Sequence, residues 1–151
     1  MTHKEKALAY FSDKFHCAPA VLAAFAEELG LTEEQALKIS YCFNSGMRRG
    51  EVCGACTGAL MVLGMKYGQS VKGDMETRNN ANRLTLEFLN RFSKANGSYI
   101  CSDILGCDIS TPEGARCALE KGRFAELCPK MVASAVNVLE EIISEEEAKA
   151  K

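Results

Sequence analysis

The sequence has no excess of positive charge, no apolar run near its start and no alternation of apolar and polar residues. Its 151 residues carry a formal net charge of -2, which argues against nucleic acid as the main partner because such partners are held by basic patches. No hydrophobic stretch follows Met1–Glu5, so we expect no signal peptide, no membrane anchor and a cytoplasmic location. The lack of strand-like alternation favours helices throughout.

Familiar catalytic patterns are also missing. No phosphate-binding glycine loop, serine triad or paired-carboxylate motif stands out. Only two histidines are present. We expect His3 to lie in a frayed terminus, and His16 to be a partly exposed residue beside Cys17, because sequence neighbours seldom form a nucleophile–base pair. The catalytic residues are therefore unknown, and the sequence leaves open whether the protein is an enzyme.

What the chain does have is eight cysteines. In a small secreted protein an even number would indicate a disulfide framework. In a helix-rich chain without an export signal, metal binding or redox chemistry is the better interpretation. A single cysteine is often only a small core residue, but we do not expect that of all eight.

The most distinctive stretch is 52–65, which contains no charged residue before Lys66. Apolar side chains occur all round its helical wheel, a pattern typical of a helix buried on every side (about 52–67) and too short to cross a bilayer. Gly58 and Gly64 each cost roughly 1 kcal/mol relative to alanine in a helix. We therefore expect another backbone or a bound group to approach closely at both glycines.

The remaining chain predicts helices packed around this central one. Pro19 and the capping-box residues Thr32 and Gln35 mark helix starts. The other helices are expected around residues 7–11, 17–29, 32–43, 76–93 and 100–106, from Thr111, and after Cys128–Pro129. The last of these has an apolar face, which makes a homodimer a candidate assembly, and its acidic end (140–147) is expected to be a solvated tail. We predict an all-α fold, with residues 1–151 forming a single compact multi-helix domain.

Several cysteines coincide with predicted helix beginnings. Cys17, Cys53 and Cys128 fall at helix starts, and Cys101 falls in a short helix. First-turn amides and the positive end of the helix dipole favour thiolate over thiol and lower a cysteine's pKa. Helix starts gathered around one point would form a pocket for an anionic cluster, so we expect these four cysteines to lie close together.

The segments that carry these cysteines resemble a known family. They are His16–Leu22, Cys53–Gly64, Gly97–Gly106, Ser110–Gly114 and Cys128–Lys130. Together they are similar to the redox-active proteins named for a C…CGAxxG…C…C pattern (the C_GCAxxG_C_C family), over nearly the whole chain. The resemblance implies a helical domain that holds an iron–sulfur cluster, with Cys17, Cys53, Cys101 and Cys128 as the cofactor-binding and metal-binding residues. It does not supply a reaction.

The other four cysteines fall outside the family's set. We expect Cys42, Cys107 and Cys117 to be small buried residues. Cys56 is a further candidate ligand, because Cys53 and Cys56 form a CxxC at a helix start, as in dithiol redox centres. The βαβ unit that usually carries such a pair is absent. A related domain accompanies covalent haem, but Thr57 follows Cys56, so there is no CxxCH and covalent haem is not carried over.

Three functions follow from these patterns. The first is an iron–sulfur protein in electron transfer or redox sensing, served by a redox partner protein, because four thiolates are the usual ligands of such clusters. Zinc is the runner-up cofactor, in a structural or cluster-carrier module, although the ligand spacing is unlike that of zinc fingers. The third is a metal-free thiol–disulfide oxidoreductase, with Cys53 attacking and Cys56 or another family cysteine resolving.

Overall fold

The computed structural model describes residues 1–151 and is all-α, as predicted. It contains eight α-helices, three short irregular helical turns and no β-sheet. The α-helices are α1 (His3–Ser12), α2 (Cys17–Ala24), α3 (Glu33–Ser40), α4 (Gly54–Tyr67), α5 (Met75–Asn96), α6 (Cys101–Leu105), α7 (Pro112–Glu120) and α8 (Arg123–Lys149). The turns are η1 (Glu27–Leu29), η2 (Tyr41–Phe43) and η3 (Gly46–Gly50). No helix is both long enough and apolar enough to span a membrane.

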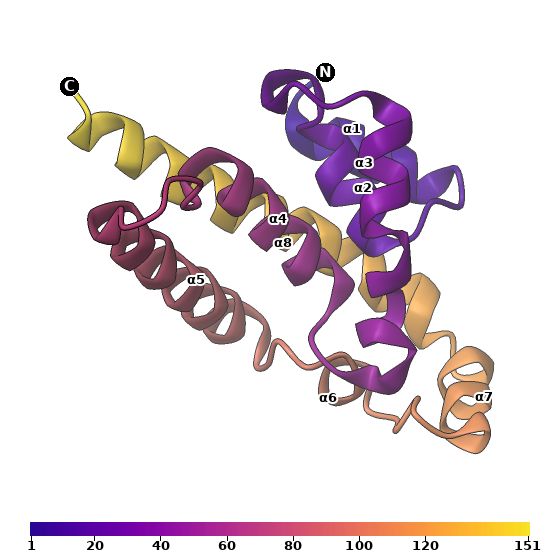
Figure 1. Ribbon diagram of the computed structural model, residues 1–151. Helices are drawn as coiled ribbons and strands as arrows, with labels where there is room; N and C mark the ends of the chain where they lie inside the picture. Colours follow the sequence, from indigo (N-terminus) through magenta and orange to yellow (C-terminus); the bar gives the residue numbers. More distant parts are fainter.

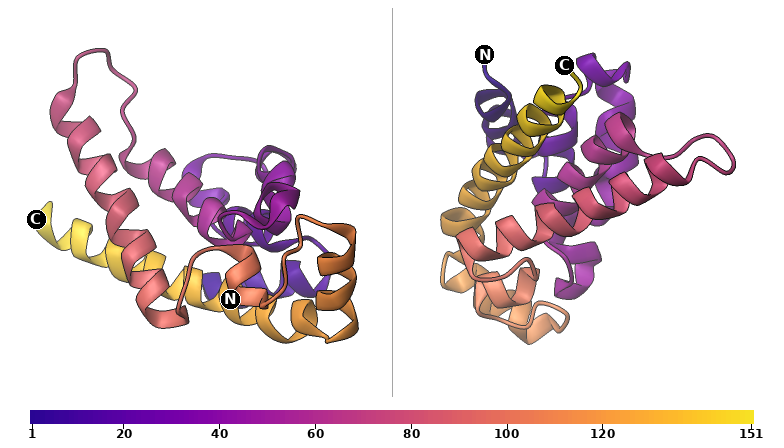
Figure 2. Two further views of the ribbon diagram at one scale, coloured as in Figure 1. Left: turned by 90° about the horizontal axis from the view of Figure 1, so that it is seen from below. Right: turned by 90° about the vertical axis from the view of Figure 1, so that its left-hand side faces the viewer.

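The helices are arranged around α4 and α8. Figure 1 shows these two crossing at the centre, with α5 along one side and α1, α2 and α3 grouped on another. The two short helices α6 and α7 lie near the first turns of α8, and Figure 2 shows the same grouping from two further directions. The core buries alanine-rich α2, the first half of α4, the Phe88 and Phe92 rings of α5, and the apolar face of α8.

Side-chain caps fix where several helices begin. The predicted capping box is confirmed, since the Gln35 amide N–H donates to Thr32 Oγ1 at 3.0 Å and the Thr32 N–H donates to Gln35 Oε1 at 2.9 Å. Thr111 caps α7, accepting from the Gly114 N–H at 3.0 Å. These bonds satisfy first-turn amides that would otherwise lack partners. The expected continuous helix to Leu29 instead ends at Ala24, with η1 following and Gly30 stopping the segment at φ 74°.

The N-terminus is ordered rather than frayed, which corrects the expectation for His3. Thr2 and Glu5 form a second capping box at the start of α1. The His3 ring stacks on Phe25 at 3.9 Å between centroids and bonds to Glu140 of α8 at 2.8 Å. These contacts link α1 to α2 and α8, and explain why the first helix begins at residue 3.

The central helix begins after Cys53 and ends before Gly68, as predicted. Its first half is buried on all sides, while Gly64 and Met65 face solvent. A Cβ on Gly58 would lie 2.7 Å from the Ala18 carbonyl oxygen, so the expected close approach is present there. At Gly64 the expectation is wrong, because no atom lies within 4 Å of a Cβ built at that position.

The last helix begins five residues before Cys128, so Cys128 does not stand at a helix start as predicted. It begins at Arg123 and continues through Pro129, which cannot donate to a preceding carbonyl. Packing compensates, because Phe124 and Leu127 of this first stretch lie against a small cluster formed by Cys101, Leu105, Ile109 and Ala118.

The far end of α8 is exposed to solvent, as expected, but it is helical and pairs with α5. Glu146 accepts a bond from Arg83 of α5 at 2.7 Å, and Glu145 accepts one from Arg91 at 2.7 Å. The acidic turns therefore run beside α5 and pair with its arginines. The apolar face of α8 is buried within the chain, as eight residues from Met131 to Ile143 show. The homodimer remains a prediction, but the apolar face of α8 no longer supports it because that face is buried within the chain.

Candidate functional site

Four cysteines from four separate segments line one small cavity. Cys17 is the first residue of α2, Cys53 caps the start of α4, Cys101 is the first residue of α6 and Cys128 lies within α8. The cavity has a volume of about 60 Å³. Its other lining residues are Phe11, His16, Ser45, Gly54, Phe124 and Met131.

A short antiparallel backbone pairing brings Cys53 beside Cys101. Val52 pairs with Ile100. The Cys53 N–H donates to the Tyr99 carbonyl at 2.8 Å, and the Cys101 N–H donates to the Glu51 carbonyl at 2.6 Å. Nothing in the sequence predicted this contact, since a single pair of bonds is too short to produce an alternating pattern.

Two glycines of the CGAxxG segment allow α2 to approach the start of α4. A Cβ on Gly54 would lie only 2.4 Å from Cys17 Sγ, and one on Gly58 would meet the Ala18 backbone. Both positions therefore require glycine for steric reasons. The motif places Cys17 at the cavity as well as supplying Cys53.

The loop before α4 has an unusual backbone conformation, with several residues at positive φ. Gly46 and Gly50 have positive φ, as their loop position suggested, and so do the non-glycine residues Ser45, Met47 and Arg48. Left-handed conformations cost such residues roughly 1–2 kcal/mol each, and they persist where the surroundings hold them. Ser45 lines the cavity, and its backbone N–H lowers the pKa of the Cys17 thiol, although the two make no hydrogen bond of ordinary geometry.

Burial dominates the ionisation of three of the four thiols, which corrects the expectation that helix starts would favour thiolate at each. Burial first, then the neighbouring Cys53, raise the pKa of Cys17 to about 11. Burial first, then the charges of Cys17 and Cys53, raise the pKa of Cys128 to about 12. The pKa of Cys101 is also raised, again mainly by burial. Amide groups are too few to offset desolvation and mutual repulsion.

Only Cys53 has a lowered pKa. The largest cause is the neighbouring Cys56 thiol, with the amides of Ala55 and Cys56 contributing, although none of these groups makes a hydrogen bond of ordinary geometry to the Cys53 sulfur. Cys56 is buried, and burial, followed by the neighbouring Cys53, strongly raises its pKa. Cys53 is therefore the member of the pair that ionises first, and Cys56, which does not line the cavity, keeps its proton longer.

The donor set of the cavity is compatible with a metal cluster. Its lining includes four thiols and no Lys, Arg, Asp or Glu side chain, so a bound cationic group would supply the missing counter-charge. No three His, Cys, Asp or Glu side chains are drawn together tightly enough to hold a single metal ion.

The remaining predicted residues have mixed outcomes. His16 is exposed at the N-cap of α2, makes no side-chain cap bond and lies at the cavity edge. Cys42 is exposed, and Cys107 and Cys117 are half-buried, so none of these three is the buried core residue that was expected. Ser45 and Gly54 were not predicted as site residues. Gly54 could have been found from its place in the motif, whereas no sequence signal indicated Ser45.

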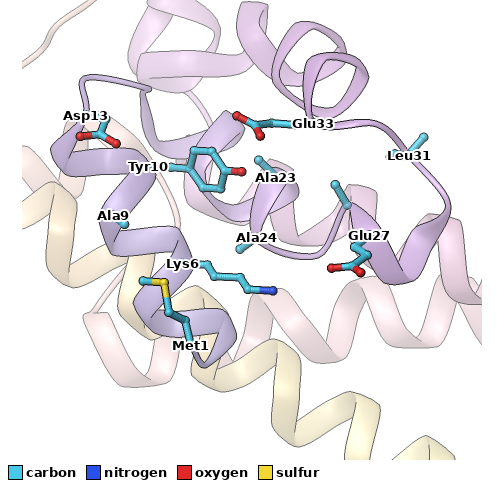
Figure 3. Close-up of a pocket in the computed structure, with 11 residues that line it drawn as sticks. Met1, Lys6, Ala9, Tyr10, Asp13, Ala23, Ala24, Glu27, Leu31 and Glu33 are labelled. Atoms are coloured by element: carbon cyan, nitrogen blue, oxygen red, sulfur yellow. The ribbon is translucent and has the colours of Figure 1, made fainter.

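A larger hollow lies elsewhere, between α1 and the segment from α2 to α3. Figure 3 shows its floor of small residues, including Ala9, Ala23 and Ala24, with Lys6 extending across it. The volume is about 460 Å³, and no cysteine lines it. Burial and then Glu33 raise the pKa of Tyr10 in its wall. The hollow has no group of thiols and is separate from the four-cysteine cavity.

Comparisons with known proteins identify the family of the chain. No curated protein and no solved structure matches the chain. A family model described as "Putative redox-active protein (C_GCAxxG_C_C)" matches residues 15–142. That range contains all four cavity cysteines and both motif glycines, and is well over half of the sequence. The chain therefore belongs to the C_GCAxxG_C_C family of redox-active proteins.

Proposed function

We propose that the protein binds an iron–sulfur cluster through Cys17, Cys53, Cys101 and Cys128, and serves in electron transfer or redox sensing with a partner protein. The observation that carries this proposal is that four cysteines, spread over more than 100 residues of sequence, line one cavity. Four thiolates are the usual ligand set of two-iron and four-iron clusters. Such a cluster, when bound, supplies reversible one-electron chemistry.

Binding of a metal cluster would change the protonation of the cavity. Three of the four thiols have raised pKa values because they are buried beside one another. Metal ligation requires thiolates and therefore releases these protons. The apolar walls formed by Phe11, Phe124 and Met131 limit water, and low polarity around a cluster is one of the factors that set its potential.

A metal-free thiol–disulfide oxidoreductase is the competing proposal. It is supported by the Cys53–Cys56 pair, in which the pKa of Cys53 is lowered and that of Cys56 is raised. However, Cys53 is 6% exposed and Cys56 is fully buried. Thiol–disulfide exchange needs an accessible attacking sulfur, so the geometry favours the role of ligand over that of nucleophile.

The decisive experiment is elemental analysis of protein purified without oxygen. We expect iron and acid-labile sulfide in the wild type, together with visible absorption and an electron paramagnetic resonance signal after reduction. Replacing Cys53→Ser should abolish iron retention. Cys42→Ser is the matched control, since Cys42 is exposed and does not line the cavity, and it should retain the wild-type content.

Other outcomes would reject the proposal. Stoichiometric zinc without sulfide would favour the structural or cluster-carrier alternative. Colourless, metal-free protein in which Cys53 and Cys56 cycle between dithiol and disulfide would favour the oxidoreductase. Equal iron loss in Cys53→Ser and Cys42→Ser would show that the ligand assignment is wrong.

A further inference from the structure

A second pair of cysteines lies outside the four-cysteine cavity. Cys107 follows α6, and Cys117 lies within α7. The Cys107 thiol donates to Cys117 Sγ across 3.4 Å. Both residues are free and half-buried, and neither lines the cavity. Unlike Cys53 and Cys56, this pair can be reached from solvent.

The backbone between the two cysteines is held in a compact turn. Gly106 ends α6 with φ 71°, and the Ser110 N–H donates to Asp108 Oδ1 at 3.1 Å. Thr111 Oγ1 donates to the Asp108 carbonyl at 3.1 Å. The start of α7 presses on the same carbonyl, since a Cβ on Gly114 would overlap it. These contacts fold the segment back on itself and hold the two sulfurs facing each other.

The hydrogen bond distinguishes the two sulfurs, because Cys107 donates it and Cys117 accepts it. The bond to Cys117, followed by burial, raises the pKa of Cys107, against the opposing charges of Lys121 and Arg123. Cys107 is therefore the donor of this pair and Cys117 the acceptor.

We propose that Cys107 and Cys117 form a second redox site, a dithiol that small-molecule disulfides such as oxidised glutathione convert to an intramolecular disulfide. Cys117 loses its proton and attacks one sulfur of the oxidant, whose S–S bond breaks and releases one thiolate. Cys107 then loses its proton and attacks the mixed disulfide at Cys117, which forms the Cys107–Cys117 bond and releases the second thiolate. The two released thiolates take up the two protons, so the oxidant gains two electrons and the protein loses two.

The new bond would tether the segment carrying Cys101 to α7. Cys107 and Cys128 both pack against the small cluster that contains Cys101 and Ala118. Closing the disulfide therefore restrains one wall of the four-cysteine cavity. The test of this pair follows Cys107 and Cys117 themselves, so its outcome is distinguishable from a loss of iron from the cavity.

Peptide mapping after treatment with oxidised glutathione tests the proposal. Trypsin cleaves after Arg116 and so separates peptide 95–116, which contains Cys107, from peptide 117–121, which contains Cys117. In the wild type, handled as purified without oxygen, we expect these two peptides to be joined, with two thiols lost and no glutathione retained on either. Cys42→Ser should behave as the wild type does.

Two variants make the assignment specific. In Cys107→Ser, Cys117 has no resolving partner, so peptide 117–121 should keep a glutathione adduct. In Cys117→Ser, loss of the attacking sulfur should slow the reaction of Cys107 by at least tenfold. The proposal is overturned if the wild type keeps glutathione on Cys117. It is also overturned if the joined peptides persist in Cys107→Ser, since peptide 95–116 would then be linked through Cys101.

Discussion

At the scale of single residues, the cavity depends on side chains that are absent as much as on those that are present. Gly54 leaves space for the Cys17 sulfur, and Gly58 leaves space for the backbone of Ala18. Gly64, in the same helix, has no neighbour within 4 Å of the position that a Cβ would occupy. The three glycines look alike in sequence but have different physical reasons for their presence.

This difference predicts opposite effects of alanine on stability. Gly58→Ala should lower the free energy of unfolding by about 1–3 kcal/mol, because its Cβ would overpack against the Ala18 carbonyl. Gly64→Ala should raise it by up to about 1 kcal/mol, because alanine is the better helix former and the site is open. Denaturant unfolding measures both. Destabilisation by Gly64→Ala would contradict the open environment described here.

Gly54 offers a test of cofactor retention that leaves every cysteine in place. Gly54→Ala should displace the Cys17 sulfur, because a Cβ would lie 2.4 Å from it, and a misplaced ligand typically costs about tenfold or more in metal affinity. Iron per chain after anaerobic purification is the measurement. Gly64→Ala serves as the control, and an iron content in Gly54→Ala that equals this control would sink the prediction.

At the scale of helices, the pairing of α5 with the end of α8 is mainly electrostatic on its outer side. Arg83 bonds to Glu146, whose side chain is 11% exposed, and Arg91 bonds to both Glu87 and Glu145. The Arg83 hydrogen bond is the largest cause that holds the pKa of Glu146 below its ordinary value of 4.5. Part-exposed pairs of this kind contribute little individually.

The lowered pKa of Glu146 predicts a pH-dependent contribution to stability. Because the folded state favours the carboxylate, the contribution is complete above the ordinary pKa of 4.5 and is lost as pH falls through the lowered value. At neutral pH, Glu146→Gln should lower the free energy of unfolding by about 0.5–1 kcal/mol. The difference from wild type should vanish in acid, where both side chains are neutral.

Thermal unfolding of both proteins at neutral and acidic pH measures this effect. Glu120→Gln is a suitable control, because Glu120 is exposed at the end of α7 and has no ion pair. An equal loss of stability for Glu146→Gln at both pH values would mean that packing, and not charge, is responsible.

Most helices could be predicted from sequence because their signals are local. Capping residues such as Thr32 and Thr111, and the apolar face of α8, depend on neighbours a few residues apart. The start of α8 was missed because Pro129 suggests a helix beginning, whereas tertiary packing of Phe124 and Leu127 extends the helix past it. Local rules cannot weigh that packing against the cost of an internal proline.

At the scale of the whole molecule, the site also has features that the sequence predicts and features that only the folded chain determines. The gathering of four cysteines was expected from their positions at predicted helix starts and from the family resemblance, and the structure places all four on one cavity. Their ionisation was not predictable, because burial and the proximity of other thiols exist only in the folded chain. The left-handed turn at Ser45 likewise depends on the surroundings that hold it.

The cavity joins segments from both halves of the sequence, so occupying it should stabilise the fold. A thiophilic ion such as Cd²⁺, added to protein freed of its own metal, should draw the cavity thiols together in the folded state and raise Tm with concentration. Thiols with pKa values near 11 and 12 must lose protons on binding. The apparent affinity should therefore rise between about pH 6 and pH 9, by up to about tenfold per pH unit for each proton released.

Titration calorimetry in buffers of different ionisation enthalpy counts these protons, and Cys128→Ser should release fewer than Cys42→Ser. A pH-independent affinity would mean that the cavity thiols are already ionised before any metal arrives.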